Sequence, residues 1–208
     1  MIKITTLLSI VLVSSCSLLG IQNEEQPHYE VIKKDGDFEI RKYDSYVVAK
    51  TTVKGDFTDS SNKAFRILAG YIFGKNKGNN KISMTSPVEM NPTPLSIPMT
   101  SPVEMNQQED EYTMSFSMPS NFTIETLPEP VDKRIAFEVV PSRIVASHEY
   151  SWFSSRKKNR KKAQELREWL AEYKDYSVNP NYTYAGYNPP WTIPFLRRNE
   201  VHIVLRAR

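Results

Sequence analysis

The sequence predicts an α+β domain made of two similar halves, in each of which strands flank one helix. Two patterns predict this class. In several short segments apolar and polar residues alternate, which is the period of a half-buried strand. In two longer segments apolar residues recur every three or four positions, which is the period of an amphipathic helix. The chain has 208 residues, of which 39% are apolar and 25% charged, an ordinary composition for a globular protein.

The first half is predicted to begin with three strands. Residues 29–32 form a short apolar segment, and residues 38–43 (FEIRKY) alternate between apolar and polar. The dipeptide Asp-Gly at positions 35–36 separates them and is a hairpin signal. Residues 46–53 are rich in β-branched side chains, which favour a strand that continues the same sheet.

A helix is predicted next. Asp56 or Thr58 is a suitable N-cap, and Gly74 is a suitable stop signal. Its apolar stripe consists of Ala64, Phe65, Leu68, Tyr71 and Ile72. Residues 81–84 are expected to resume extended structure, and residues 112–118 show the cleanest alternation in the chain.

The second half repeats this order. Strands are predicted at 135–139 and 143–150, a helix from about 155 to 174, and strands at 182–187 and 201–205. The helix carries Ala163, Leu166, Leu170 and Tyr173 on one face. Because each helix must bury one stripe against a sheet, the two halves are expected to form one domain.

The first twenty residues are expected to lie outside this fold. A positive residue, Lys3, precedes a short apolar stretch at 4–13, which is too short to span a bilayer comfortably. Val-Ser-Ser-Cys follows, and its Cys16 is the one cysteine of the chain. This pattern resembles a bacterial lipobox, which predicts that residues 1–15 are a signal peptide and that Cys16 is lipidated. An ordinary secretory signal or a short membrane anchor are the alternatives.

The expected organisation is therefore a signal peptide (1–15), a lipidated tether (16–27) and a single domain (28–208). The lipid on Cys16 would hold the domain at a membrane of the bacterial cell envelope. By resemblance to Gram-negative sorting signals, Ser17 in the position after the cysteine implies the outer membrane, with the domain facing the periplasm.

The eight residues MTSPVEMN occur twice, at 84–91 and at 99–106. Three interpretations are open. The repeat is a duplication within a tolerant loop, a pair of matched edge strands, or a methionine-rich metal site. Pro87 and Pro102 favour a sheet edge or a strand end, because proline donates no backbone hydrogen bond. The metal interpretation is the weakest, because no histidine or cysteine accompanies the methionines.

Charge and motifs exclude several function classes. The formal net charge is +3, and the basic residues are spread along the chain, so no nucleic-acid partner is expected. The dense run at 156–162 is interpreted as a solvated helix start, with a surface for phosphate or lipid headgroups as the alternative. The sequence has no nucleophile elbow, phosphate-binding glycine loop or metal-spaced His/Cys cluster, so we expect no enzyme.

Four separated segments carry recognisable motifs: residues 38–43, 64–76, 81–88 (KISMTSPV) and 187–201 (YNPPWTIPFLRRNEV). In the same order, they resemble motifs of the SOUL heme-binding protein family. The resemblance covers roughly residues 28–206. It implies a distorted β-barrel with two flanking helices and a pseudo-twofold repeat of strand-strand-helix-strand-strand, related to effector-binding domains.

The resemblance also implies that the chain binds haem or a related tetrapyrrole, in a pocket between the first helix and the loop before the last strand. The residues of this chain in those two regions are Phe65, Arg66, Leu68, Tyr71 and Ile72, and then Trp191, Ile193, Phe195, Arg197 and Arg198. The arginines would meet the propionates through charge-assisted hydrogen bonds. In the alternative interpretation, the helix residues are core and the arginine pair only braces the last strand.

The axial ligand is where the chain departs from the family pattern. Lys42 stands where some members carry a histidine, and a protonated amine is a poor iron ligand. Thr192 stands where some relatives carry a basic residue. His28, His148 and His202 are expected to be surface residues. We therefore expect binding by hydrophobic contact and propionate pairing, suited to buffering or transfer. The alternative is a non-haem module of the same fold that recognises another apolar ligand or a protein partner.

Overall fold

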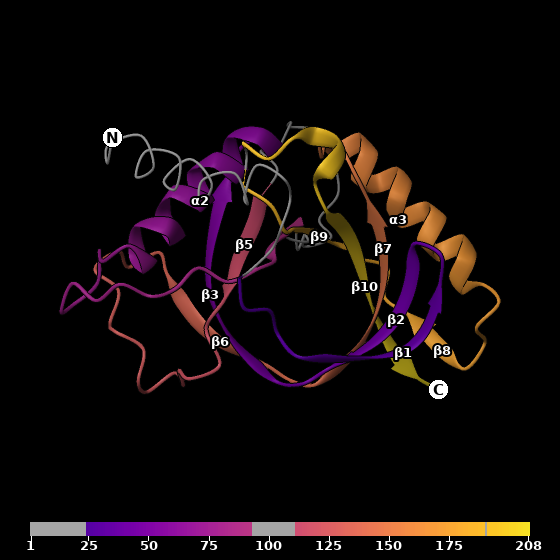
Figure 1. The fold of residues 1–208 in the computed structure, drawn as a ribbon, viewed down its shortest axis with the longest axis horizontal. Coiled ribbons are helices and arrows are strands. Elements are labelled where there is room, and N and C mark those ends of the chain that lie inside the picture. Colours follow the sequence, from indigo (N-terminus) through magenta and orange to yellow (C-terminus); the bar gives the residue numbers. More distant parts are fainter. Residues whose placement is uncertain (1–23, 93–110, 190) are drawn as a thin grey trace, which may run out of the picture.

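The computed structural model describes residues 24–92, 111–189 and 191–208, which form one curled antiparallel sheet with two helices on its outer side (Figure 1). In chain order the elements are β1 (Tyr29–Asp35), β2 (Phe38–Tyr43), β3 (Tyr46–Lys54), α2 (Phe57–Ile72), β4 (Val88–Pro92), β5 (Glu111–Ser117), β6 (Ala136–Val140), β7 (Arg143–Tyr150), α3 (Arg156–Leu170), β8 (Tyr176–Val178), β9 (Thr183–Gly186), the 3-10 helix η1 (Pro194–Leu196) and β10 (Asn199–Ala207). No helix within the described ranges is long and apolar enough to cross a membrane.

The strand order is β1-β2-β7-β10-β9-β4-β5-β3-β6, and β8 pairs with the end of β10. The pairing of β4 with β9 joins the two halves of the sheet, through the partners Val88 and Gly186, Glu89 and Ala185, and Met90 and Tyr184. The prediction of an α+β fold, a distorted β-barrel with two flanking helices, is confirmed, and the barrel takes the form of a curled half-barrel sheet.

Helix α2 covers β3 and β5. Asp56 caps it, since the Asp56 carboxylate accepts hydrogen bonds from the backbone N–H groups of Thr58 and Asp59 at 2.8 and 3.1 Å. The helix ends at Ile72, and the following Gly74 has a φ of +109°, a left-handed conformation that favours glycine. The side of α2 that faces the sheet packs onto a core that includes Ile82, Met114, Phe116 and Ile135.

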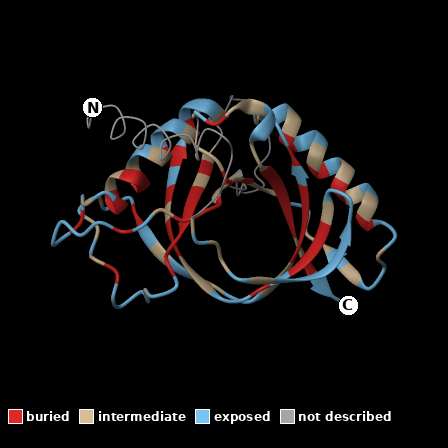
Figure 2. Cartoon of the chain, in the orientation of Figure 1, coloured by how far each residue is buried: buried red, intermediate tan, exposed pale blue. Residues whose placement is uncertain are grey.

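Helix α3 covers β7 and β10 in the other half. Ser155 caps it by accepting from the Lys158 N–H at 3.2 Å. Leu166 and Leu170 pack against Ile40 and Ile203 of the sheet, and burial of each such leucine stabilises the fold by about 1.5–3 kcal/mol. Figure 2 shows the resulting pattern, with buried residues where the helices meet the sheet and exposed residues on their outer faces.

Most predicted element bounds are close to the observed ones. Strands β2 and β7 have the predicted ends, whereas α3 ends at Leu170, before the predicted residue 174. Residues 81–84 are not a strand; Thr85 forms an isolated bridge with Glu25, and the strand β4 begins only at Val88. Two short elements, β8 and η1, were not predicted, because neither is long enough to show a period.

The first copy of the repeat, residues 84–91, leads into β4. This strand lies between β5 and β9, so the predicted edge position is wrong for this copy, whereas Pro87 does lie directly before a strand. The Thr85 hydroxyl donates to the backbone carbonyl of Ser117. The second copy, residues 99–106, lies outside the described residues, as does Cys16, so the duplication and the lipidation stay predictions.

Candidate functional site

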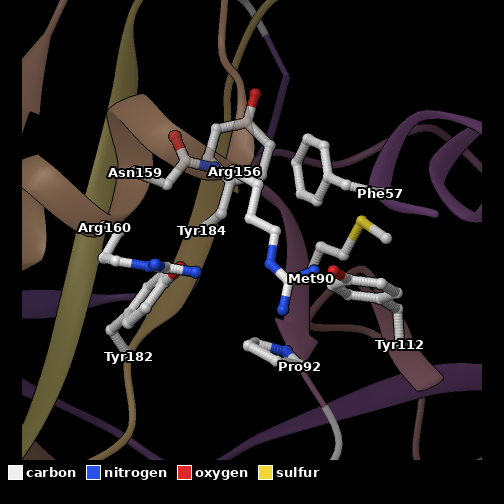
Figure 3. A pocket seen from close by; sticks show the side chains of 9 residues that line it. All are labelled: Phe57, Met90, Pro92, Tyr112, Arg156, Asn159, Arg160, Tyr182 and Tyr184. Atoms are coloured by element: carbon white, nitrogen blue, oxygen red, sulfur yellow. The ribbon is translucent and has the colours of Figure 1, made fainter. Parts of the chain in front are cut away.

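A pocket of about 170 Å³ lies between the N-terminal ends of the two helices, over the seam where β4 pairs with β9. Figure 3 shows its lining: Phe57, Met90, Pro92, Tyr112, Arg156, Asn159, Arg160, Tyr182 and Tyr184. These side chains come from α2, β4, β5, α3 and β9 and from the residue before β9. Both halves of the domain therefore contribute to one cavity.

The walls of the pocket are largely aromatic. The Phe57 ring meets the edges of Tyr112 and Tyr184, with ring centroids 5.8 and 6.1 Å apart. Such edge contacts are the favoured geometry of aromatic pairs. The Met90 side chain is buried beside these rings. The Tyr184 hydroxyl donates to the Asn199 Oδ1 atom at 2.9 Å, and burial raises the pKa of Tyr184, so its hydroxyl is neutral near pH 7.

Two arginines near the start of α3 give the pocket its positive charge. Arg156 and Arg160 are four residues apart, so they lie on the same helix face, and Figure 3 shows both guanidinium groups among the aromatic rings. Asn159 lies between them and is held in place, because its Oδ1 accepts hydrogen bonds from the Tyr150 and Ser154 hydroxyls. An apolar cavity with two such guanidinium groups suits a flat aromatic ligand that carries carboxylates.

A second hollow, of about 290 Å³, lies at the C-terminal end of α3. Its lining includes Tyr173, Tyr176 and Arg208. Arg167 of this lining donates from an Nη atom to the Pro180 carbonyl at 2.6 Å. This hollow belongs to one half of the domain and has fewer aromatic walls, so we place the candidate site in the pocket between the helices.

The face of β10 that points away from α3 carries a buried charged network. Val201, Ile203 and Leu205 face α3, so the alternating residues Glu200 and His202 face the other side of the sheet. The Glu200 carboxylate accepts hydrogen bonds from Arg41 (2.7 and 3.1 Å), Arg198 (2.8 Å), Tyr187 (2.9 Å) and His202 (2.6 Å).

The contacts within the network shift the pKa values of Glu200 and His202 so that both favour their charged forms. Burial alone would raise the pKa of Glu200, but hydrogen bonds and charge from His202 and Arg41 outweigh it and hold that pKa well below the ordinary value. Burial likewise opposes protonation of His202, yet its carboxylate partners Glu200 and Glu89 raise the pKa of the imidazole. Both oxygens of Glu200 are engaged by several donors, so the network is a structural feature rather than a ligand site.

Three of the predicted ligand residues lie in the core. Leu68, Tyr71 and Ile72 have at most 1% of their surface exposed and pack between α2 and the sheet. The Tyr71 ring lies against Phe137, with centroids 5.6 Å apart. These three residues face the sheet, as the apolar stripe of a helix does, and none of them lines the pocket between the helices.

The other two predicted residues of α2 also lie apart from the pocket between the helices. Phe65 is partly buried, with its ring centroid 5.5 Å from that of Phe116. Arg66 is exposed on the outer face of the helix. Neither belongs to the pocket lining, which takes only Phe57 from this helix.

The predicted residues before β10 divide into two groups. Arg198 belongs to the buried network: it stacks on the Tyr187 ring at 4.0 Å and lies 3.3 Å from the Glu149 carboxylate. Arg197 donates to the Thr192 carbonyl at 2.9 Å. Trp191 and Phe195 are exposed, and Ile193 precedes η1 as its N-cap. Arg198 thus holds on to the last strand through its hydrogen bond to Glu200.

The histidine prediction is wrong for two of the three residues. His202 and His148 are buried, the first in the charged network and the second beside the Phe38 ring, with centroids 4.2 Å apart. His28 is exposed and pairs with Asp44 at 2.7 Å. Lys42 is exposed on β2. Among the described residues, no group of three or more His, Cys, Asp or Glu side chains is arranged to hold a metal ion.

Sequence reasoning missed the residues that line the pocket. Arg156 and Arg160 belong to the basic run that was interpreted as a solvated helix start, and Met90 belongs to the repeat. The four-residue spacing of the two arginines was the available signal, since it places both on one helix face. Nothing local in the sequence indicates that Phe57 and Tyr182 lie opposite them.

Comparisons with known proteins agree with this fold. A model of the SOUL heme-binding protein family matches residues 24–204. Heme-binding protein 2 of Homo sapiens is 30% identical over 170 residues, covering 81% of this chain and 78% of the relative. Heme-binding protein 1 of Xenopus laevis is 27% identical over 196 residues, covering 93% and 97%.

Among solved structures, the C-terminal domain of EcmrR superposes with a TM-score of 0.59 at 12% identity, covering 86% of this chain and 99% of that domain. At this identity the likeness concerns the fold alone. The family match spans most of the chain and is independent of that structural likeness. The chain belongs to the SOUL heme-binding protein family.

Proposed function

We propose that the chain binds haem or a related tetrapyrrole in the pocket between α2 and α3, as a binding protein rather than an enzyme. One observation carries the proposal: the pocket combines four aromatic rings with two guanidinium groups. A tetrapyrrole offers the complementary chemistry, a flat apolar ring with carboxylates at one edge. The family match, and relatives named as heme-binding proteins, support the same ligand class.

The size of the pocket sets the mode of binding. Pockets that enclose a drug-sized ligand measure about 300–1,000 Å³, whereas this pocket measures about 170 Å³. It therefore takes one edge of the macrocycle, and the rest of the ring lies across the surface. Arg156 and Arg160 are placed to meet propionates, since a guanidinium forms paired hydrogen bonds with a carboxylate.

The lining residues imply that the protein coordinates the haem iron weakly. The described lining contains no histidine or cysteine, and of its residue types only methionine and tyrosine serve as axial ligands in other haem proteins. Met90 is buried behind the rings, and the Tyr184 hydroxyl is bonded to Asn199. Binding thus depends on ring contact and charge, and a macrocycle held in this way exchanges readily.

We also propose where in the cell this exchange of haem takes place. Lipidation of Cys16 would anchor the domain in the bacterial envelope, in the outer membrane facing the periplasm, where a readily exchanging site buffers haem or passes it on. The alternative function is recognition of another apolar ligand or a protein partner by the same fold.

Haem titration followed by absorbance tests the ligand class. We expect a Soret shift that saturates at micromolar haem, and metal-free protoporphyrin, followed by fluorescence, should bind within a few-fold of the same affinity. A charge-assisted hydrogen bond contributes about 1.5–3 kcal/mol, so Arg160→Ala should weaken binding roughly tenfold to a hundredfold. The matched control is Arg66→Ala, which removes an exposed arginine from the outer face of α2 and should bind like the wild type.

Two outcomes would overturn the proposal. The absence of a Soret shift at micromolar haem would leave the alternative function. Unchanged affinity in Arg160→Ala together with a large loss in Arg197→Ala would move the site to the loop before β10, as the sequence predicted.

A further inference from the structure

Five large apolar side chains are exposed together at the ends of two loops. We call Trp152, Phe153, Trp191, Phe195 and Leu196 the aromatic patch. Its four aromatic residues are 56–62% exposed, and Leu196 is 37% exposed. Single exposed apolar residues are common, but several on adjoining loops are typical of a surface that contacts a partner or a membrane.

The two loops are held together by the backbone. The Trp152 N–H donates to the Pro194 carbonyl at 2.9 Å, and the buried Asn199 amide donates to the Trp152 carbonyl at 2.9 Å. The Arg197 guanidinium lies 4.7 Å from the centre of the Phe153 ring. Exposure of the patch is therefore built into the fold of both loops.

The backbone at Trp152 is strained. Its φ of +75° lies in the left-handed region, which a bulky residue rarely adopts. Strain of this kind persists where surrounding contacts impose it, and it is concentrated at functional positions. Here the hydrogen bonds on both sides of Trp152 hold the conformation in which its indole faces solvent.

Positive charge adjoins the patch. Residues 151–162 contain six lysines and arginines and no acidic residue. Of these, Arg156, Lys157, Arg160 and Lys161 are exposed. The first turn of α3 has no acidic residue, although the N-terminus of a helix disfavours cations. Helix stability thus does not account for the cations of the first turn, whereas an anionic partner would; further along the helix, Lys161 lies 3.8 Å from the Glu165 carboxylate.

We propose that the aromatic patch and the basic start of α3 bind the surface of an anionic lipid bilayer. Tryptophan is enriched at membrane interfaces, where its ring lies at headgroup level. Basic residues beside such a ring are attracted to anionic headgroups. The proposal depends neither on tetrapyrrole binding nor on lipidation of Cys16, because it concerns how the folded domain itself meets a membrane.

The tryptophans provide a local readout. The chain has three, and the third, Trp169, lies outside the patch, where it stacks on Phe38 and its indole N–H donates to Asp35. In a Trp169→Phe variant of the full chain, fluorescence comes from the patch alone. The signal then reports insertion of the patch, whether or not the N-terminal residues attach the chain to the vesicle.

The test uses vesicles of phosphatidylcholine alone and vesicles in which about a third of the lipid is phosphatidylglycerol, each with brominated chains as quenchers. We expect a blue shift and strong quenching on the anionic vesicles and little change on the neutral ones. Each cation near an anionic surface contributes about fivefold in partitioning. Lys157→Glu with Lys161→Glu should therefore lower patch binding by at least about twentyfold.

Two controls complete the design. Lys42→Glu with Lys133→Glu makes the same charge change at exposed lysines elsewhere and should leave quenching unchanged. If Trp169→Phe fails to fold, the double variant Trp152→Phe, Trp191→Phe gives the converse test, since its remaining tryptophan should not respond to brominated lipid.

Patch tryptophans that stay unquenched and open to acrylamide on anionic vesicles would overturn the proposal. Equal quenching in the Lys157→Glu, Lys161→Glu variant would do so as well. Burial of the patch by a second copy of the chain, seen as a concentration-dependent mass without lipid, would assign the surface to self-association instead.

Discussion

Replacement of Glu200 by glutamine tests the buried charged network. The substitution keeps the size of the side chain and removes the charge that Arg41, Arg198 and His202 share. Removal of one partner from a buried ion pair costs about 3–5 kcal/mol, because the remaining charges stay buried. For a domain of this size each kcal/mol lowers the melting temperature by about 2–4 °C, so we expect a decrease of roughly 6–20 °C.

The loss should also depend on pH in a defined direction. The pKa of His202 is raised above its ordinary value of 6.5. A raised pKa stabilises the folded state below the ordinary value, and this stabilisation is lost as the pH rises through the raised pKa. Since Glu200 is a main cause of that shift, the difference in unfolding free energy between wild type and Glu200→Gln should be larger at pH 5.5 than at pH 9.

Urea unfolding at the two pH values measures this difference. The control is Glu129→Gln, which removes an exposed carboxylate that pairs with Lys77 at 2.6 Å. Such surface pairs contribute about 0–1 kcal/mol, so the control should unfold like the wild type. Two results would refute the interpretation of the network as a stabilising element. The free energy of unfolding of Glu200→Gln could lie within about 1 kcal/mol of the wild-type value, or the difference between the two could grow towards pH 9.

Three further predictions concern other parts of the chain. Leu166→Ala removes a fully buried side chain between α3 and the sheet and should lower the free energy of unfolding, measured in urea, by about 2–5 kcal/mol. A smaller loss would mean that neighbouring side chains fill the cavity. Asp56→Ala removes the N-cap of α2 and should lower the free energy of unfolding by about 0.5–2 kcal/mol, and an unchanged value would show that water replaces the cap. Cys16→Ala should abolish incorporation of labelled palmitate, whereas persistent labelling would disprove lipidation at this residue.

The sequence predicts most elements of the fold because burial imposes a period on them. The apolar residues of β10, Val201, Ile203 and Leu205, face α3 and therefore alternate. The same alternation misled us about His202, which was expected to be a surface residue but is buried beside Glu200. The face of β10 that points away from α3 is also buried, and an alternating pattern does not distinguish a buried polar face from a solvated one.

The site was less predictable than the fold. The spacing of Leu68, Tyr71 and Ile72 marks an apolar stripe, and that stripe is equally the signature of a core-facing helix, which is what the structure shows. The pocket depends instead on the pairing of Met90 with Tyr184 across the sheet. Only the tertiary structure brings those two residues together, so no window of sequence contains the site.

The strand order has a consequence for how the chain acquires its structure. β2 from the early part of the chain pairs with the late strand β7, and β6 from the later part pairs with the early strand β3. Each half of the sheet therefore contains a strand from the other part of the chain. A nascent chain that ends at residue 130 lacks strands of both halves, so neither half of the sheet can be complete. Because such distant pairings must form together, we expect slow folding in one cooperative step, and two fragments cut between β5 and β6 should be unstructured until they are mixed.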